Sequence, residues 1–140
     1  MRLNFTEEHH FHVSPHASYP MIPIAMMGRP GTRVDTLALV DSGSDDCLFH
    51  ARWLKRIGLE LTRGRPEDRR GIKEGHPVKC YIHRVWLIIG NQSRIRCDVA
   101  FSEEIGDDVR DQLLGRETVF DRYRFGFRAR NLKLYVGRES

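Results

Sequence analysis

The sequence predicts a mainly β fold in which strand-like segments close into a small barrel. Six to eight segments show the apolar alternation or apolar runs of strands, whereas only two short segments have helical spacing. Turn residues separate neighbouring strand-like segments, so we expect crossing hairpins. The 140 residues contain no internal repeat and no linker, which predicts one domain over residues 1–140.

The first predicted strands form a hairpin. Residues 21–27 (MIPIAMM) are apolar, and Pro23 favours an edge strand because proline has no N–H to donate to a neighbouring strand. GRPGT, residues 28–32, is typical of a turn, and residues 34–40 (VDTLALV) follow as the second strand.

The rest of the chain alternates between strands, loops and short helices. Residues 51–57 (ARWLKRI) have helical spacing, and Gly58 supplies a C-terminal stop. Residues 64–75 are charged and glycine-rich, which predicts an exposed loop. The segment 113–123 is expected to begin as a strand and to become a short helix. The other predicted strands cover residues 78–89, 95–101, 124–127 and 132–136.

Charge and cysteine content limit the classes of function. The net charge is +4, but basic residues are scattered among 19 acidic ones, so we expect a solvated surface and no nucleic-acid partner. No apolar run approaches the roughly 20 residues that span a bilayer. Residues 1–18 are polar, without a signal-peptide core or a predicted structure, and we expect a cytoplasmic protein with no membrane partner. Three cysteines without CxxC spacing favour free thiols and no zinc site.

Two short motifs carry the chemistry. In ALVDSGSDDCLF, residues 38–49, an apolar strand ends in Asp41 and continues into an Asp-Ser-Gly-Ser turn. About 70 residues later the chain reads LLGR, residues 113–116, just before the predicted short helix. Asp-Ser-Gly alone occurs often by chance and is good turn chemistry, but its combination with the apolar strand and LLGR is fairly specific.

Together these motifs resemble the retropepsin-like aspartic proteases, especially their bacterial soluble members. ALVDSGSDDCLF is similar to the family's catalytic strand and turn, and LLGRETVFDRYRFGF is similar to its glycine-arginine segment and helix. Residues 64–78 lie where the family has its glycine-rich flap. The resemblance implies a small closed barrel of the acid protease type with one or two short helices, forming a two-fold symmetric dimer.

The resemblance also implies roles for individual residues. Asp45 should pair with Arg116 and so join the catalytic turn to the LLGR segment. The catalytic residues are Asp41, Ser42 and Gly43. The substrate-binding residues are Asp45, Asp46, Gly71, Ile72 and Gly75. The residues that support the site are Ser44, Leu114, Gly115 and Arg116.

The implied activity is an aspartic endopeptidase without cofactor or metal. Two carboxylates a few ångström apart hold one proton between them, because both cannot ionise cheaply. The ionised one takes a proton from water, and the protonated one donates to the peptide carbonyl. The chain has one Asp-Ser-Gly, at Asp41, so a homodimer must supply the second carboxylate.

Other interpretations stay open at this stage. The same dimeric barrel could hold peptides or partner proteins without cutting them, and a basic nucleic-acid-binding barrel is a further alternative. The histidines at positions 9, 10, 12 and 16 suggest a metal site, although a solvated segment is favoured. Cys47 lies beside the catalytic turn, and we interpret it as a small buried residue.

Overall fold

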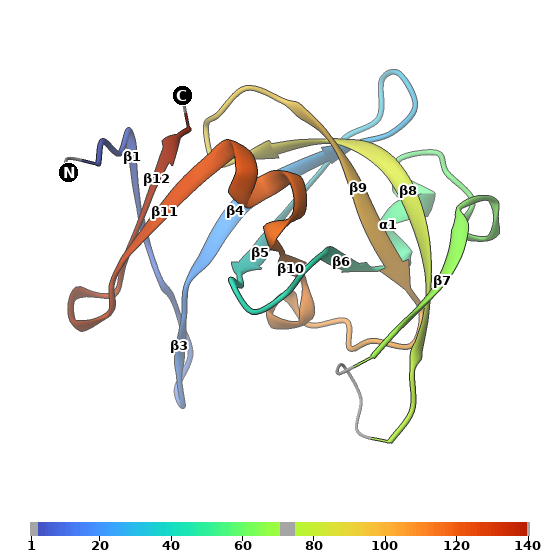
Figure 1. Cartoon of the computed structure of the whole chain (residues 1–140), viewed down its shortest axis with the longest axis horizontal. Helices are drawn as coiled ribbons and strands as arrows, with labels where there is room; N and C mark the ends of the chain where they lie inside the picture. The colour runs from blue at the N-terminus through green and yellow to red at the C-terminus, as the bar shows by residue number, and fades with distance from the viewer. Residues whose placement is uncertain (1–2, 71–74, 140) are drawn as a thin grey trace.

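The computed structural model of the chain describes residues 3–70 and 75–139 (Figure 1). The strands are β1 (Glu7–His10), β2 (His12–Val13), β3 (Ser18–Tyr19), β4 (Met21–Met27), β5 (Val34–Val40), β6 (Cys47–His50), β7 (Arg65–Arg69), β8 (Val78–Ile89), β9 (Ile95–Ser102), β10 (Leu113–Leu114), β11 (Tyr123–Arg128) and β12 (Lys133–Arg138). The helical segments are α1 (Arg52–Arg56), η1 (Leu61–Arg63), η2 (Val109–Asp111), η3 (Arg116–Phe120) and η4 (Ala129–Asn131).

The central sheet closes on itself. Its strand order is β4-β5-β10-β6-β9-β8, and β4 also pairs with β8, so these strands form a closed barrel to which β7 is added beside β8. Most pairs are antiparallel, but β10 runs parallel to β5 and β6 runs parallel to β9. The prediction of a mainly β barrel with short helices is confirmed.

Alternating side chains fill the barrel interior. The buried residues of β8 and β9 on this side are Val85, Leu87, Ile89, Ile95, Cys97, Val99 and Phe101. Each fully buried aliphatic side chain contributes about 1.5–3 kcal/mol relative to exposure. Because side chains alternate across a strand, this period-two pattern is what identified both strands in the sequence.

β4 is not an edge strand, so that prediction was wrong. It pairs with β5 along most of its length and with β8 from Ile24 onwards. Pro23 lies one residue before the β4–β8 pairing begins, and its carbonyl accepts a hydrogen bond from Gly90 N at 2.8 Å. An interior strand tolerates proline here because the missing N–H falls outside the ladder with β8.

The charged segment after Gly64 is a strand where we predicted an exposed loop. β7 pairs with β8 in an antiparallel register from Arg65 opposite Ile82 to Arg69 opposite Val78. Its alternating charges do not have the apolar pattern that signals a strand, because β7 lies at the sheet edge, outside the closed barrel. Residues 71–74 lie outside the described residues.

The N-terminal segment also has more structure than its sequence predicts. β1 pairs with β12, which pairs with β11, and these three strands form a separate sheet at one end of the molecule (Figure 1). Along β1, Glu7 and His9 are half-buried whereas Glu8 and His10 are exposed, so the segment is not simply solvated. Within residues 3–70 and 75–139, no helix is long and apolar enough to cross a membrane.

Candidate active site

Asp41 stands directly after β5, where the chain leaves the barrel and turns. Its backbone N–H donates to the carbonyl of Leu114 at 3.1 Å. Its carboxylate oxygen Oδ1 accepts the backbone N–H of Gly43 at 2.9 Å, and its carbonyl accepts that of Ser44 at 3.2 Å. The turn therefore holds both the backbone and the carboxylate of Asp41 in place.

The turn is supported by β10, which lies between β5 and β6. Leu113 is opposite Leu39 of β5 and also opposite Leu48 of β6, whereas Leu114 is opposite Val40. Leu114 is fully buried. A strand of two residues thus bridges the two strands on either side of the turn at Asp41, which explains why an apolar pair is needed about 70 residues after it.

Gly115 allows the segment after β10 to contact the turn closely. A Cβ at this position would overlap the backbone of Asp46, so no other residue fits without displacing the chain. The next two backbone N–H groups donate to carbonyls of the turn, Arg116 to Ser44 and Glu117 to Asp45, each at 2.9 Å. The two motifs found in the sequence are therefore one structural unit.

The predicted ion pair between Asp45 and Arg116 is present. The side chain of Arg116 is 58% exposed and that of Asp45 is 71% exposed. A pair this open to solvent contributes less than about 1 kcal/mol to stability. Its main effect is to orient the Asp45 carboxylate toward η3, because the buried contacts of β10 and Gly115 already hold the two segments together.

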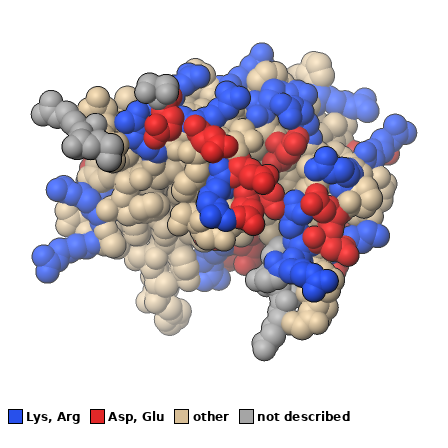
Figure 2. Space-filling model, in the orientation of Figure 1, with Lys and Arg blue, Asp and Glu red and all other residues tan. Residues whose placement is uncertain are grey.

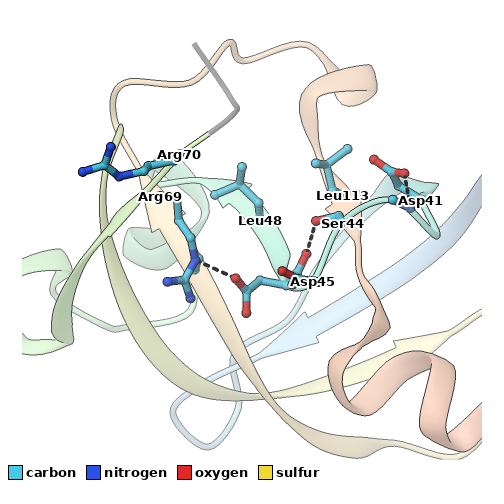
Figure 3. A pocket seen from close by; sticks show the side chains of 10 residues that line it. Asp41, Ser44, Asp45, Leu48, Arg69, Arg70 and Leu113 are labelled. Carbon is cyan, nitrogen blue, oxygen red and sulfur yellow. Dashed lines mark hydrogen bonds and ion pairs between the residues drawn. The ribbon is translucent and has the colours of Figure 1, made fainter. Parts of the chain in front are cut away.

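Beside Asp41 lies a cleft of about 230 Å³ (Figure 3). Apolar side chains from three strands line part of it, namely Leu48, Ala100 and Leu113. Arg69, at the end of β7, and the following Arg70 line another part. The remaining lining residues belong to the turn: Asp41, Gly43, Ser44, Asp45 and Asp46. The carboxylate of Asp41 thus borders a cleft that has apolar side chains on one part and charged side chains on the rest.

Arg69 connects β7 to the turn. Its Nε lies 2.6 Å from Oδ2 of Asp46, and its Nη1 lies 2.5 Å from Oε1 of Glu67. The hydrogen bond from Arg69 lowers the pKa of Glu67. Burial acts to lower the pKa of Arg69, but the hydrogen bond to Glu67 and the charge of Asp46 outweigh it and raise that pKa. Glu67 and Arg69 are therefore charged together at neutral pH.

Comparisons with known proteins bear on the fold. No protein-family model matches the chain, and no curated protein matches its sequence. Among solved structures the chain is similar to the EIAV protease complexed with the inhibitor HBY-793. The TM-score is 0.52 over 79% of this chain and 93% of that one, at 16% sequence identity. The chain has a retropepsin-like fold. An identity this low shows the fold alone, so the activity has to be argued from the site.

Within this retropepsin-like fold, the structure brings most of the predicted site residues together. The predicted turn residues that border the cleft are Asp41, Gly43, Ser44, Asp45 and Asp46. Ser42 is exposed at the tip of the turn. Of the predicted flap residues, Gly71 and Ile72 lie outside the described residues. Gly75 is described, with φ of 88°, and it does not line the cleft. The similarity is to a retroviral enzyme, so membership among bacterial soluble proteins stays a prediction.

Sequence reasoning missed part of the cleft. Leu113, which the sequence assigned to the LLGR motif, is half-buried and lines the cleft with Leu48 and Ala100. Arg69 and Arg70 were assigned to an exposed loop. A signal for the arginines was available, because they lie within residues 64–78, the segment where the resemblance places the flap.

Other reactive side chains near the site have structural roles. Cys47 is 1% exposed, which confirms it as a small buried residue. A hydrogen bond with Cys97, together with burial, raises the pKa of the Cys47 thiol well above its usual value, so it is not a thiolate nucleophile. In the described part of the chain no cluster of three or more His, Cys, Asp or Glu side chains could hold a metal ion.

Proposed function

We propose that the protein is a homodimeric aspartic endopeptidase in which Asp41 of each subunit supplies one of two catalytic carboxylates. The observation that carries this proposal is the position of Asp41 in a retropepsin-like fold. Its carboxylate is held by Gly43 N–H, at the end of an apolar strand and beside a cleft that is partly lined by apolar side chains. A residue that served only as a turn former would not need to border such a cleft.

The proposed chemistry needs the second subunit. Two Asp41 carboxylates that meet on a two-fold axis share one proton. The ionised carboxylate takes a proton from a water molecule, whose oxygen adds to the peptide carbonyl carbon. The protonated carboxylate donates to the carbonyl oxygen, and a proton then passes to the amide nitrogen as the C–N bond breaks. The exposed hydroxyl of Ser42 would bond to the opposite turn and align the two subunits.

The same cleft suits an extended peptide. Leu48, Ala100 and Leu113 offer apolar contacts to a side chain next to the scissile bond. Asp45 and Asp46 would receive backbone N–H groups of the substrate. We therefore propose that the substrates are peptides and proteins. Each chain would contribute one catalytic domain, and the reaction would need no cofactor. The buried free cysteines are compatible with the reducing cytoplasm, where we expect the enzyme to act.

The decisive experiment replaces Asp41 by Asn. An unfolded protein substrate is incubated with the wild-type protein and with Asp41→Asn, and fragments are counted by mass spectrometry. We expect specific cleavage by the wild type and none by Asp41→Asn, with both proteins dimeric by light scattering. Asp35→Asn is the matched control, because Asp35 lies on β5, the strand that leads to Asp41, with its side chain 68% exposed and paired to Arg33.

Two results would overturn the assignment. If Asp41→Asn cleaved as well as the wild type, the activity would come from another group or a contaminant. If the wild type bound peptides without cutting them, the alternative of a dimeric binding module on the same fold would replace the enzyme.

A further inference from the structure

Arg69 separates the cleft beside Asp41 from a second cavity. This second cavity has a volume of about 290 Å³ and shares Asp45, Asp46, Arg69 and Ala100 with the cleft. The two cavities are therefore neighbours, and Arg69 belongs to the boundary between them. Figure 3 shows Arg69 directed in toward the turn, whereas Arg70 points away from Leu48 and Leu113.

The guanidinium of Arg69 is held on two sides. Arg69 and Glu67 are two residues apart on β7, so their side chains lie on the same face of the strand. The contacts of 2.6 Å to Asp46 and 2.5 Å to Glu67 leave the Arg69 side chain 21% exposed and that of Asp46 24% exposed. Partly buried pairs of this kind are screened by salt less than surface pairs are. The charge of Asp46 is thus balanced within the protein.

The second cavity is acidic without Arg69. Its carboxylates come from Asp45, Asp46, Glu67, Asp98 and Glu117. Among the residues that the structure describes, its one other cationic lining residue is Arg65, which lies 3.7 Å from Glu67 with its side chain 69% exposed. Although the whole chain has a net charge of +4, Figure 2 shows acidic side chains gathered near the middle of one face, with Lys and Arg around them.

We infer that Arg69 determines specificity in the proposed substrate cleft. It pairs with Asp46 and stands between the cleft and the acidic cavity, so it balances the charge of Asp46 beside Leu48 and Ala100. This part of the cleft therefore selects an uncharged side chain over Lys and Arg, because the Asp46 carboxylate is already paired. This inference rests on the proposed function in one respect, namely that a peptide occupies the cleft.

Removing the charge of Arg69 should reverse the preference. Arg69→Met keeps an unbranched side chain of similar reach but removes the cation beside Asp46 and leaves Glu67 with Arg65, 3.7 Å away. A Lys or Arg side chain of a peptide can then take the place of the guanidinium. We expect the preference of the Arg69→Met protein for Lys or Arg over uncharged side chains to rise about fivefold. This change corresponds to about 1 kcal/mol for a partly exposed ion pair.

The test uses Asp41→Asn protein, which binds without cutting, and a pool of random-sequence decapeptides. Bound peptides are recovered and sequenced by mass spectrometry for Asp41→Asn alone and for the same protein with Arg69→Met. We expect the peptides bound by Asp41→Asn alone to have uncharged residues at one peptide position. Those bound by the protein that also carries Arg69→Met should have Lys or Arg at that position. Arg33→Met is the matched control, because it removes the same charge and breaks the exposed pair with Asp35.

Two further variants separate the effect of charge from damage to the fold. Arg69→Lys should restore the preference for uncharged side chains, and adding Asp46→Asn to Arg69→Met should lower the preference for Lys and Arg. Thermal unfolding of each variant is recorded alongside, and if Arg69→Met does not unfold cooperatively it is replaced in the comparison by Arg69→Gln, which also removes the charge.

The outcomes are distinct from those for the proposed enzyme. If Arg69→Met selects the same peptides as its parent, the inference about Arg69 is overturned while the peptidase stands. If the selection changes as expected but protein with Asp41 intact cuts nothing, the role of Arg69 stands in a binding module. If the parent retains no peptide from the pool, both proposals are overturned.

Discussion

At the scale of single residues, Gln112 links three elements just before β10. Its side chain is fully buried, and its amide oxygen accepts the indole N–H of Trp53 from α1. Its amide nitrogen donates to the hydroxyl of Thr36 at 3.1 Å and to the carbonyl of Leu37 at 2.7 Å. A buried amide with every group bonded fixes the position of the chain where it enters the site.

Replacing Gln112 by Ala should lower the free energy of unfolding by about 3 kcal/mol. The change leaves the Trp53 N–H and the Leu37 carbonyl buried without their partner, and each lost partner costs about 1–3 kcal/mol. Urea unfolding measures the effect. Trp53→Phe should lower the free energy of unfolding by less than Gln112→Ala does. The double variant should lose less free energy than the sum of the two single losses, because both substitutions remove the hydrogen bond between Trp53 and Gln112. Strict additivity would show that the two side chains act independently.

At the scale of elements, β1 is attached to the barrel through Glu7. This side chain is 8% exposed, and it accepts the backbone N–H of Asn91 at 2.9 Å and a hydrogen bond from Gln92 in the β8–β9 turn. His9, two residues further along β1, lies 2.9 Å from the same carboxylate. β1 therefore contacts the barrel at the β8–β9 turn in addition to extending the sheet of β11 and β12.

The two neighbouring glutamates of β1 provide a matched pair of variants. Glu7→Ala should lower the free energy of unfolding by about 2 kcal/mol, because it removes several hydrogen bonds to a buried carboxylate. Glu8 points to the other face of the strand, 49% exposed, with Lys133 at 3.1 Å. Glu8→Ala should cost less than about 1 kcal/mol. Equal losses in chemical unfolding would argue against the attachment through Glu7.

At the scale of the whole molecule, the proposed activity depends on the assembly of two chains. Each chain contains one Asp-Ser-Gly turn, so one subunit holds half of the proposed catalytic pair. In a symmetric dimer the same surface of both subunits meets at the axis. Activity should therefore depend on both subunits of each dimer and not on each chain separately.

Mixed dimers test this dependence. Wild-type chain refolded with a ninefold excess of Asp41→Asn chain should lose activity to about one tenth per wild-type chain, because only that share finds a wild-type partner. The rate of peptide cleavage per wild-type chain measures the effect. A ninefold excess of Asp35→Asn should leave it unchanged. Unchanged activity with Asp41→Asn would mean that each chain acts alone.

Much of the candidate site could be predicted from the sequence because its signals are local. Asp41, Gly43 and Ser44 form a turn whose chemistry is set by adjacent residues, and Gly115 stands out beside an apolar pair. The order of these motifs along the chain then indicated the barrel. In contrast, β7 carries alternating charges, and its pairing with β8 could not be recognised from apolar alternation.

The sequence by itself determined the strands with apolar alternation, the turn at Asp41 and the segment that supports it, since each depends on residues close together in the chain. Only the tertiary structure decided that Arg69 pairs with Asp46, that Gln112 joins Trp53 to β5, and that β1 adds to β12. These contacts join residues distant in sequence, and a single chain carries no local pattern for them. Their energies arise only when folding brings the partners together and removes them from water.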